Sequence, residues 1–444
     1  MSKRILTGFA LTFVLFASPP AMKAQRDLEQ FADSVDVIEV EVLVQVLHKG
    51  EPVRGLTADR VRILDERKPR EIVYFEERTF ESTASPATGR SESVDPQEPL
   101  AQIDSSAQRN FLFVFDATTQ APRRIDQWVT SLGSTLIEAP GTRCGVIIKG
   151  TSGFVIASPL TARTEVTSAA LTFVEALFQR DVAAMRRAQG DLQLLLQQDD
   201  RALALLESRF GILNPDASLI GILGNRPNAD AGVASARDIS VGPDESMSDR
   251  FAVTNRLMGN VVADQVIDLS RSLAATARLF GQPTGDRHVL LISGGVNSEA
   301  MVSSPAMDNA NVGSVVRGEA QLMFREFHRL GWRIQGLPLG AGFSPGLFYF
   351  AEETGGKVYE NFHRPAELLA QVERDTSVSY LISFQVPSNE LDDRWHQLKV
   401  RIDGLPRRAR IVHRPAYFAS TSPPRPFDER TAPPFELSFE TSSD

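Results

Sequence analysis

Short apolar runs and amphipathic stretches follow one another through the middle of the chain. FLFVF at 111–115 and HVLLIS at 288–293 have the length and composition of buried strands, whereas 252–280 has the periodicity of a helix. Strands that alternate with helices over 109–375 predict an α/β domain of the doubly wound type with a mostly parallel sheet. The runs RCGVIIKG and GFVIASPL are separated by two residues, so they predict a hairpin that adds one antiparallel edge strand.

The segments on either side of this domain alternate apolar and polar residues, as half-buried strands do. Residues 35–79 contain VDVIEVEVLVQV, and residues 376–419 contain SYLISFQVP and WHQLKVRI. The alternation predicts a small antiparallel β segment at each end. Because a piece of two or three strands is marginally stable alone, we hypothesise that the two segments pair into one β-sandwich.

The amino terminus has the layout of a secretory signal peptide. Lys3 and Arg4 precede the apolar stretch ILTGFALTFVLFA, and small residues follow up to Ala24. This pattern predicts a signal peptide over residues 1–24 and an exported protein, periplasmic or secreted. The alternative is an uncleaved segment, which would then be the protein's contact with a membrane.

Three further segments are expected to lie outside the folded core. Residues 80–108 are rich in Ser, Pro, Ala and Glu, a composition that predicts a flexible linker. Residues 420–444 carry several prolines and few aliphatic residues, which predicts a disordered tail. Residues 165–250 are a helical and loop-like insertion in the α/β domain, and long loops of this kind are usually functional or disordered.

The formal charge of the chain argues against a nucleic-acid partner. The charge is -9 at pH 7. Cleavage after Ala24 would remove Lys3, Arg4 and Lys23 and no acid, which makes it -12 (-9 minus 3). Binding to nucleic acid depends on basic side chains that neutralise phosphates, so we expect no such partner.

Cys144 is the sole cysteine of the 444 residues and lies in the run RCGVIIKG. It therefore forms no disulfide within the chain. Two roles stay open for it: a buried thiol in a strand, and a catalytic cysteine, which would need an activating base nearby. The sequence indicates no such base, which favours the buried thiol.

Several motifs occur in a fixed order along the chain. GEPVRGLT at 50–57 is followed by VRILDERKPREIVYF at 61–75, in which Arg67 stands where glycine is usual. FLFVFD, the stretch LFYFAEETGG at 347–356, and then YLISF, WHQLKVRI and RPAYFA come later. In this order, over residues 35–419, the motifs resemble the von Willebrand factor A (VWA)-related domain proteins of the acidobacterial type. The resemblance implies an exported VWA domain flanked by small β segments.

The resemblance also implies where a metal ion would bind. Many VWA domains hold Mg²⁺ with a D-x-S-x-S motif after a strand, a threonine from a later loop and an aspartate after another strand. Here the motif is DATTQ at 116–120, and the later strand ends at Ser293 where an aspartate is often found. The candidate ligands of Mg²⁺ or Mn²⁺ are therefore Asp116, Thr118, Gln120 and Ser293, in a degenerate site whose loop threonine cannot be assigned.

Two interpretations of Asp116 stay open. It is either a metal ligand, or a carboxylate that accepts backbone N–H bonds from the turn and helix that follow it. Mg²⁺ prefers six oxygen ligands and gives up its water reluctantly, so one carboxylate and one or two hydroxyls form a weak site. We therefore expect no cofactor other than a Mg²⁺ or Mn²⁺ ion at this site.

The motifs of common enzymes are missing from the sequence. The six histidines form no H-E-x-x-H motif, no G-x-S-x-G elbow occurs, and LISGG at 291–295 lacks the lysine of a P-loop. We therefore predict an exported non-catalytic protein that mediates protein–protein interaction or adhesion, with an unidentified protein partner and no small-molecule substrate. The alternatives are a structural or assembly component of the cell envelope and, with less support, a hydrolytic enzyme.

Overall fold

The structure is a computed structural model, and its described residues cover most of the predicted folded regions. The predicted signal peptide, and most of the predicted linker, insertion and tail, lie outside the described residues. The described residues are 37–80, 108–118, 124–150, 153–181, 247–296, 310–339, 344–360 and 363–421, with short stretches between 183 and 191.

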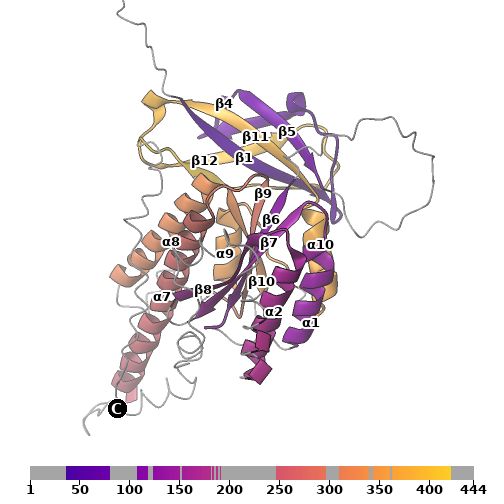
Figure 1. Cartoon of the computed structure of the whole chain (residues 1–444). Coiled ribbons are helices and arrows are strands. Elements are labelled where there is room, and N and C mark those ends of the chain that lie inside the picture. The colour runs from indigo at the N-terminus through magenta and orange to yellow at the C-terminus, as the bar shows by residue number, and fades with distance from the viewer. Residues whose placement is uncertain are drawn as a thin grey trace, which may run out of the picture. The chain divides into compact units, whose positions relative to one another are not determined.

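A five-stranded sheet runs through the middle of the described chain (Figure 1). Its strands are β6 (Arg109–Asp116), β7 (Thr142–Gly150), β8 (Gly153–Thr161), β9 (Asp286–Ser293) and β10 (Trp332–Pro338). They lie in the order β10, β9, β6, β7, β8, and every neighbouring pair is parallel except β7 and β8. Because parallel strands end at one edge of a sheet, the residues that follow β6 and β9 come close together there.

Helices cover both faces of this sheet, and each face has its own apolar core (Figure 1). One face is covered by a first group of helices: α1 (Ile125–Leu132), η2 (Gly133–Ile137), α2 (Thr164–Gln179) and α10 (Pro365–Asp375). The other face is covered by a second group: α7 (Met247–Phe280), α8 (Ala310–Leu330) and α9 (Pro345–Glu353).

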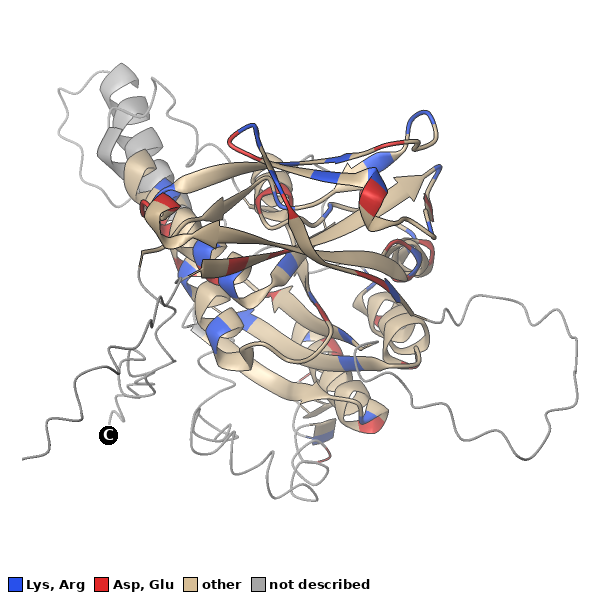
Figure 2. Ribbon diagram, turned by 90° about the horizontal axis from the view of Figure 1, so that it is seen from above, with Lys and Arg blue, Asp and Glu red and all other residues tan. Residues whose placement is uncertain are grey.

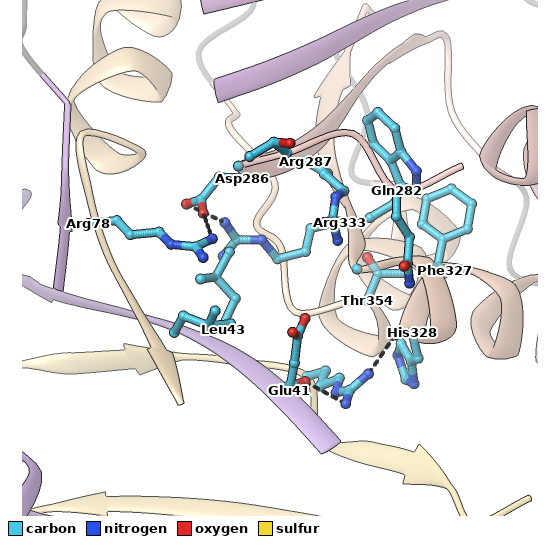
Figure 3. A pocket seen from close by; sticks show the side chains of 16 residues that line it. Glu41, Leu43, Arg78, Gln282, Asp286, Arg287, Phe327, His328, Arg333 and Thr354 are labelled. Atoms are coloured by element: carbon cyan, nitrogen blue, oxygen red, sulfur yellow. Dashed lines mark hydrogen bonds and ion pairs between the residues drawn. The ribbon is translucent and has the colours of Figure 1, made fainter. Parts of the chain in front are cut away.

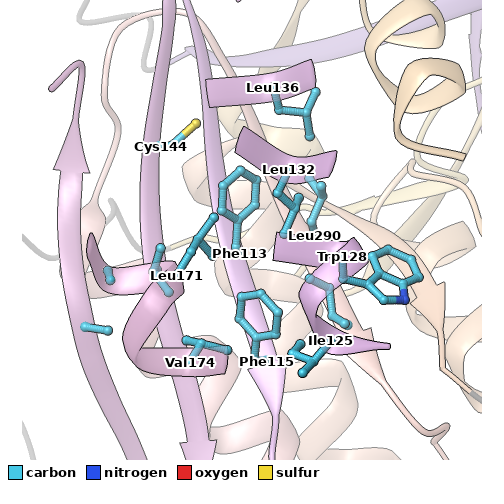
Figure 4. Close-up of a cluster of buried hydrophobic side chains, with 14 of the residues drawn as sticks. Phe113, Phe115, Ile125, Trp128, Leu132, Leu136, Cys144, Leu171, Val174 and Leu290 are labelled. Atoms are coloured by element: carbon cyan, nitrogen blue, oxygen red, sulfur yellow. The ribbon is translucent and has the colours of Figure 1, made fainter. Parts of the chain in front are cut away.

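The side chains of β6 alternate between these two cores. Phe113 and Phe115 pack with α1 and α2, as Figure 4 shows, whereas Leu112 and Val114 pack with the helices of the opposite face. Successive side chains of a strand point to opposite faces of a sheet, so a strand covered on both faces is apolar throughout. This explains why the run at 111–115 has no polar position.

Two further sheets, both antiparallel, are built from the two ends of the described chain. One has the order β13, β1, β11, β5, with β2 on β1, and the other has the order β14, β12, β3, β4. Their elements are β1 (Val37–His48), β2 (Glu51–Pro52), η1 (Ala58–Arg60), β3 (Val61–Asp65), β4 (Lys68–Arg70), β5 (Ile72–Thr79), β11 (Val378–Pro387), η3 (Ser388–Glu390), β12 (Trp395–Ile402), β13 (Arg410–Val412) and β14 (Ala416–Phe418).

The two antiparallel sheets share one apolar core. Val42 of β1 pairs with Ile382 of β11 in one sheet, and both pack in the same cluster as Ile63 of β3 and Val400 of β12 in the other. Burial of an aliphatic side chain of this size contributes about 1.5–3 kcal/mol. Val73 and Tyr74 of β5 are exposed on the outer surface, and Figure 2 shows acidic and basic residues spread over the strands of these sheets.

The fold class predicted from the sequence is wrong for the chain as a whole. A doubly wound, mostly parallel α/β sheet was expected to dominate, but nine of the fourteen described strands lie in the two antiparallel sheets (5 + 4 of 5 + 5 + 4). The chain is therefore a mixed α and β structure. The physical reason is that the end segments, read as small flanks, pair with each other over long registers, as β1 and β11 do.

The end of α9 explains the T-G-G motif. Thr354 Oγ1 accepts a hydrogen bond from the backbone N–H of Ile334 in β10 at 2.9 Å. Gly355 has a φ of 75°, in the left-handed region that glycine adopts readily. A Cβ on Gly356 would lie 1.9 Å from the carbonyl oxygen of Ile334, so a side chain there would push the helix end away from β10.

Candidate functional site

Asp116 ends β6 and is almost completely buried, with 2% of its surface exposed. Its Oδ1 accepts hydrogen bonds from the backbone N–H of Thr118 at 3.0 Å and from Thr118 Oγ1 at 2.5 Å. Its Oδ2 accepts a hydrogen bond from Ser293 Oγ at 2.8 Å. A buried charge is tolerated only when it is paired or hydrogen-bonded, and this carboxylate has hydroxyl donors on both oxygens.

Ser293 ends β9, the strand beside β6, and is fully buried. Its hydroxyl oxygen donates to Asp116 and accepts a hydrogen bond from the backbone N–H of Gly295 at 3.1 Å. Gly295 has a φ of 129°, which allows the chain to turn sharply after the strand. The serine therefore links the carboxyl ends of two parallel strands and fixes the turn that follows one of them.

The structure thus brings together three of the four residues predicted to form the site. Thr118 and Ser293 both form hydrogen bonds with Asp116, and Gln120 lies outside the described residues. The backbone bond from Thr118 is of the kind expected of a carboxylate that fixes the turn after its strand. Whether a metal ion binds there stays a prediction.

Lys149 of β7 is a member of this edge that the sequence analysis missed. It is the register partner of Asp116, so the two side chains lie on the same face of the sheet. The lysine is 2% exposed. Its Nζ donates a hydrogen bond to the carbonyl oxygen of Gly150 at 2.5 Å and forms an ion pair with Asp268 of α7. A buried ammonium group therefore accompanies the carboxylate on this face.

A signal for Lys149 exists in the sequence. The run RCGVIIKG carries one charge near its end, just as FLFVFD does, and in both strands the charge follows buried apolar residues. A charged side chain at that position of a covered strand has to find a partner. Reading the two strands together would have placed Lys149 beside Asp116.

The described donor set is a poor match to Mg²⁺. It contains one carboxylate, whose two oxygens both accept hydrogen bonds from Thr118 and Ser293, whereas Mg²⁺ requires six oxygen ligands in octahedral array. Lys149 adds a positive charge on the same face, and like charges repel strongly where water is excluded. Within the described ranges, no three His, Cys, Asp or Glu side chains are grouped as ligands of a metal ion.

The thiol of Cys144 lies in the apolar core between the sheet and the first group of helices (Figure 4). It is 2% exposed, and burial raises the pKa of the thiol far above its ordinary value. The thiolate form that a catalytic cysteine needs is therefore strongly disfavoured.

The described histidines at 288, 328 and 396 are packed against other groups. His288 is fully buried, and burial lowers its pKa well below the ordinary value. His328 Nε2 donates a hydrogen bond to the carbonyl oxygen of Glu353 at 2.6 Å, and burial lowers its pKa to about 3. His396 Nδ1 lies 3.2 Å from a carboxylate oxygen of Asp65, within the polar network of the antiparallel sheets.

Comparison with known proteins gives no family for the chain. No known sequence family and no curated protein matches it. None of the described helices is both long and apolar enough to cross a membrane.

Some solved structures overlap with part of the chain. The N-terminal domain of TFIIH p34 is 12% identical, with 60% of this chain and 96% of that chain covered and a TM-score of 0.25. Proximal thread matrix protein 1 from the mussel byssus is 12% identical, with 61% and 48% covered and a TM-score of 0.26. The minor pilin PilB from Streptococcus sanguinis is 9% identical, with 61% of each chain covered and a TM-score of 0.26. Overlaps this weak carry no argument about function.

Proposed function

We propose that the chain is an exported, non-catalytic VWA-related protein that binds another protein at the carboxyl edge of its parallel sheet, without a divalent cation. The observation that carries this proposal is the contact between Ser293 Oγ and Asp116 Oδ2 at 2.8 Å. Ligands of open α/β sheets bind outside the carboxyl ends of the strands, and this contact lies at that edge.

The hydrogen bonds of the edge support binding without a cation. The Asp116 carboxylate has hydroxyl donors on both of its oxygens, and Lys149 forms an ion pair with Asp268. Each buried charge at this edge therefore has a partner within the protein, so its burial does not require a bound metal ion. A partner would then contact the exposed rim, where Gly294 is exposed directly after Ser293.

The resemblance to VWA-related proteins supports the same conclusion from the sequence. The motif that would hold the ion in many VWA domains is altered at 116–120 and again at Ser293. An interaction surface can be kept after its ion is lost, because shape and hydrogen bonds also recognise a partner. Export follows from the signal-peptide pattern over residues 1–24 and belongs to this proposal.

A capture experiment with matched variants tests the proposal. The tagged chain is incubated with cell-envelope extract of the source cells, with and without EDTA, and the retained proteins are quantified. Gly294→Arg places a bulky charge on the exposed rim and should remove the retained partner. Gly133→Arg is the control, because a Cβ at Gly133 meets no atom within 4 Å and the residue lies at the far end of α1.

The proposal predicts one set of partners that is retained by the wild type and by Gly133→Arg, equally with and without EDTA. Retention that is the same for Gly294→Arg would show that the partner binds elsewhere. Retention that disappears with EDTA would contradict the cation-independent mode.

A further inference from the structure

A cavity of about 310 Å³ lies at the opposite edge of the parallel sheet, where β9 and β10 begin. It is lined by residues of these strands, of α8 and of the antiparallel sheet that contains β1 and β11, so it lies where the two kinds of sheet meet (Figure 3). Its volume is at the lower end of the range for small-molecule sites, about 300–1,000 Å³. Gln282 and Thr284 of its lining are exposed and form its opening.

Four arginines line this cavity, and they outnumber its acids. Arg78, Arg287, Arg333 and Arg414 face Glu41 and Asp286. Figure 3 shows Arg78, Arg287 and Arg333 gathered with the two acids around one space. An excess of guanidinium groups in a partly buried cavity favours an anionic ligand, because arginine donors match carboxylate and phosphate oxygens.

Asp286, the acid that approaches Arg333, already accepts hydrogen bonds from other side chains. Asp286 Oδ1 accepts a hydrogen bond from Arg78 Nη1 at 3.1 Å, and Asp286 Oδ2 accepts one from Ser379 Oγ at 2.6 Å. Arg333 Nη2 lies 3.7 Å from Asp286 Oδ2, which is too long for a hydrogen bond. The carboxylate thus neutralises part of the charge but leaves donors of Arg333 without a partner.

Arg333 is 4% exposed, and its Nε and Nη1 make no hydrogen bond to the described residues. Its Nη2 lies 3.5 Å from His288 Nε2, in addition to its distance of 3.7 Å from Asp286 Oδ2. Burial lowers the pKa of Arg333 to about 10, and the negative charge of Asp286 offsets only part of this effect. Nε and Nη1 each expose less than 1 Å², so neither contacts a ligand directly, but the positive charge of Arg333 still acts on the cavity that its side chain lines.

Arg414, another arginine of the lining, also lacks a nearby carboxylate as a hydrogen-bond partner among the described residues. Its Nη1 donates to the carbonyl oxygen of His328 at 3.0 Å and its Nη2 to the carbonyl oxygen of Glu41 at 2.7 Å. Both acceptors are neutral backbone groups, and its Nε has no partner in the described part of the chain. Burial lowers the pKa of Arg414 to about 10 as well.

We propose that this cavity binds a small organic anion, whose carboxylate or phosphate group is attracted by the excess positive charge of the arginines that line it. The anion supplies the counter-charge that Asp286 does not provide. Leu43 and Phe327 give the cavity apolar walls beside its charges, so the ligand carries an apolar part of a few carbon atoms. The site lies at the amino-terminal edge of the sheet and is separate from the Asp116 edge.

Calorimetric titration of the whole chain with inorganic phosphate and with succinate tests this site. The expected result is saturable binding of at least one probe to a single site, and the probe that binds identifies the class of anion. Arg333→Gln should weaken that binding at least about tenfold, because it removes one of the positive charges that line the cavity. Arg62→Gln is the matched control, since Arg62 is an exposed arginine of β3 paired with Asp403, and it should bind like the wild type.

Leu43→Trp provides a second test that keeps every arginine. The larger ring fills the cavity and should remove binding, and it decides the question if Arg333→Gln does not fold by circular dichroism. Three results would overturn the proposal: no saturable binding of either probe to the folded wild type, equal loss in Arg62→Gln and Arg333→Gln, or undiminished binding in Leu43→Trp.

Discussion

Ser293 Oγ lies 2.8 Å from Asp116 Oδ2 and joins the carboxyl ends of β9 and β6 across 177 residues of sequence. The bond links the last residue of each strand, at the edge where a ligand of a parallel sheet would bind. It also completes the hydrogen bonding of a carboxylate that is 2% exposed. The contact is therefore both part of the fold and the basis of the proposed function.

Removal of this hydroxyl should destabilise the folded chain. Ser293→Ala leaves one oxygen of a buried carboxylate without its donor, and hydrogen bonds to charged groups contribute about 1.5–3 kcal/mol. We expect the free energy of unfolding, measured by urea denaturation, to fall by about 2 kcal/mol. Ser134→Ala is the control, because Ser134 bonds only to carbonyl oxygens of α1 on an exposed surface, and a change of equal size there would contradict this account.

The charged residues at the strand ends show which parts of the site can be predicted from the sequence. Asp116 was recognisable because it follows an uninterrupted apolar run, and its contact with Ser293 follows from the common edge of parallel strands. Lys149 gives the same signal and was overlooked, because its strand was read alone. The residues that meet at the carboxyl edge of the sheet could thus be predicted from the sequence. The ion pair of Lys149 with Asp268 could not, because it depends on where α7 packs.

The arginine cavity could not be predicted in this way. Arg333 and Asp286 lie at the amino-terminal ends of strands of the parallel sheet, whereas Arg78 and Glu41 come from the amino-terminal β segment. Their meeting depends on how the antiparallel sheet packs against the edge of the parallel one, and periodicity within a segment holds no information on that. The fold class failed for a related reason, since the pairing of β1 with β11 joins segments more than 300 residues apart.

The carboxyl-terminal β segment should be required for folding. A chain that ends at residue 375 loses β11 and β13, the two long-range partners of β1, and exposes the apolar core that the antiparallel sheets share. We expect this truncated chain to show no cooperative thermal transition, because one sheet without its partners cannot bury its apolar face. A transition at the wild-type temperature would show that the segment is not part of a shared core.

The thiol of Cys144 should be unreactive in the folded protein. It is 2% exposed, and its raised pKa keeps it protonated at neutral pH, whereas the thiolate is the reactive form. We expect no reaction with a disulfide reagent over an hour in native buffer and one thiol per chain in denaturant. Rapid labelling of the native protein would contradict the buried position.

His328 should make the stability of the chain depend on pH below neutrality. Its pKa is lowered to about 3, from 6.5, first because of burial and then because of the charge of Arg414. Between these values the unfolded chain binds a proton that the folded chain does not, so the free energy of unfolding falls as the pH decreases from about 6.5.

We therefore expect His328→Asn to lose about 2 kcal/mol less than the wild type between about pH 7 and pH 5, by urea denaturation at each pH. Ser134→Ala, at an exposed position without a titratable group, is the control and should follow the wild-type profile. Identical profiles for wild type and His328→Asn would refute the assignment.

The central claim, that the Asp116 edge works without a divalent cation, is tested most directly by calorimetric titration of Mg²⁺ and Mn²⁺ into the whole chain. Asp116→Ala and Asp126→Ala are titrated beside the wild type, since Asp126 is an exposed acid at the start of α1. We predict no saturable heat for any of the three proteins. Saturable binding in the wild type and in Asp126→Ala that disappears in Asp116→Ala would contradict the claim and show a working metal site.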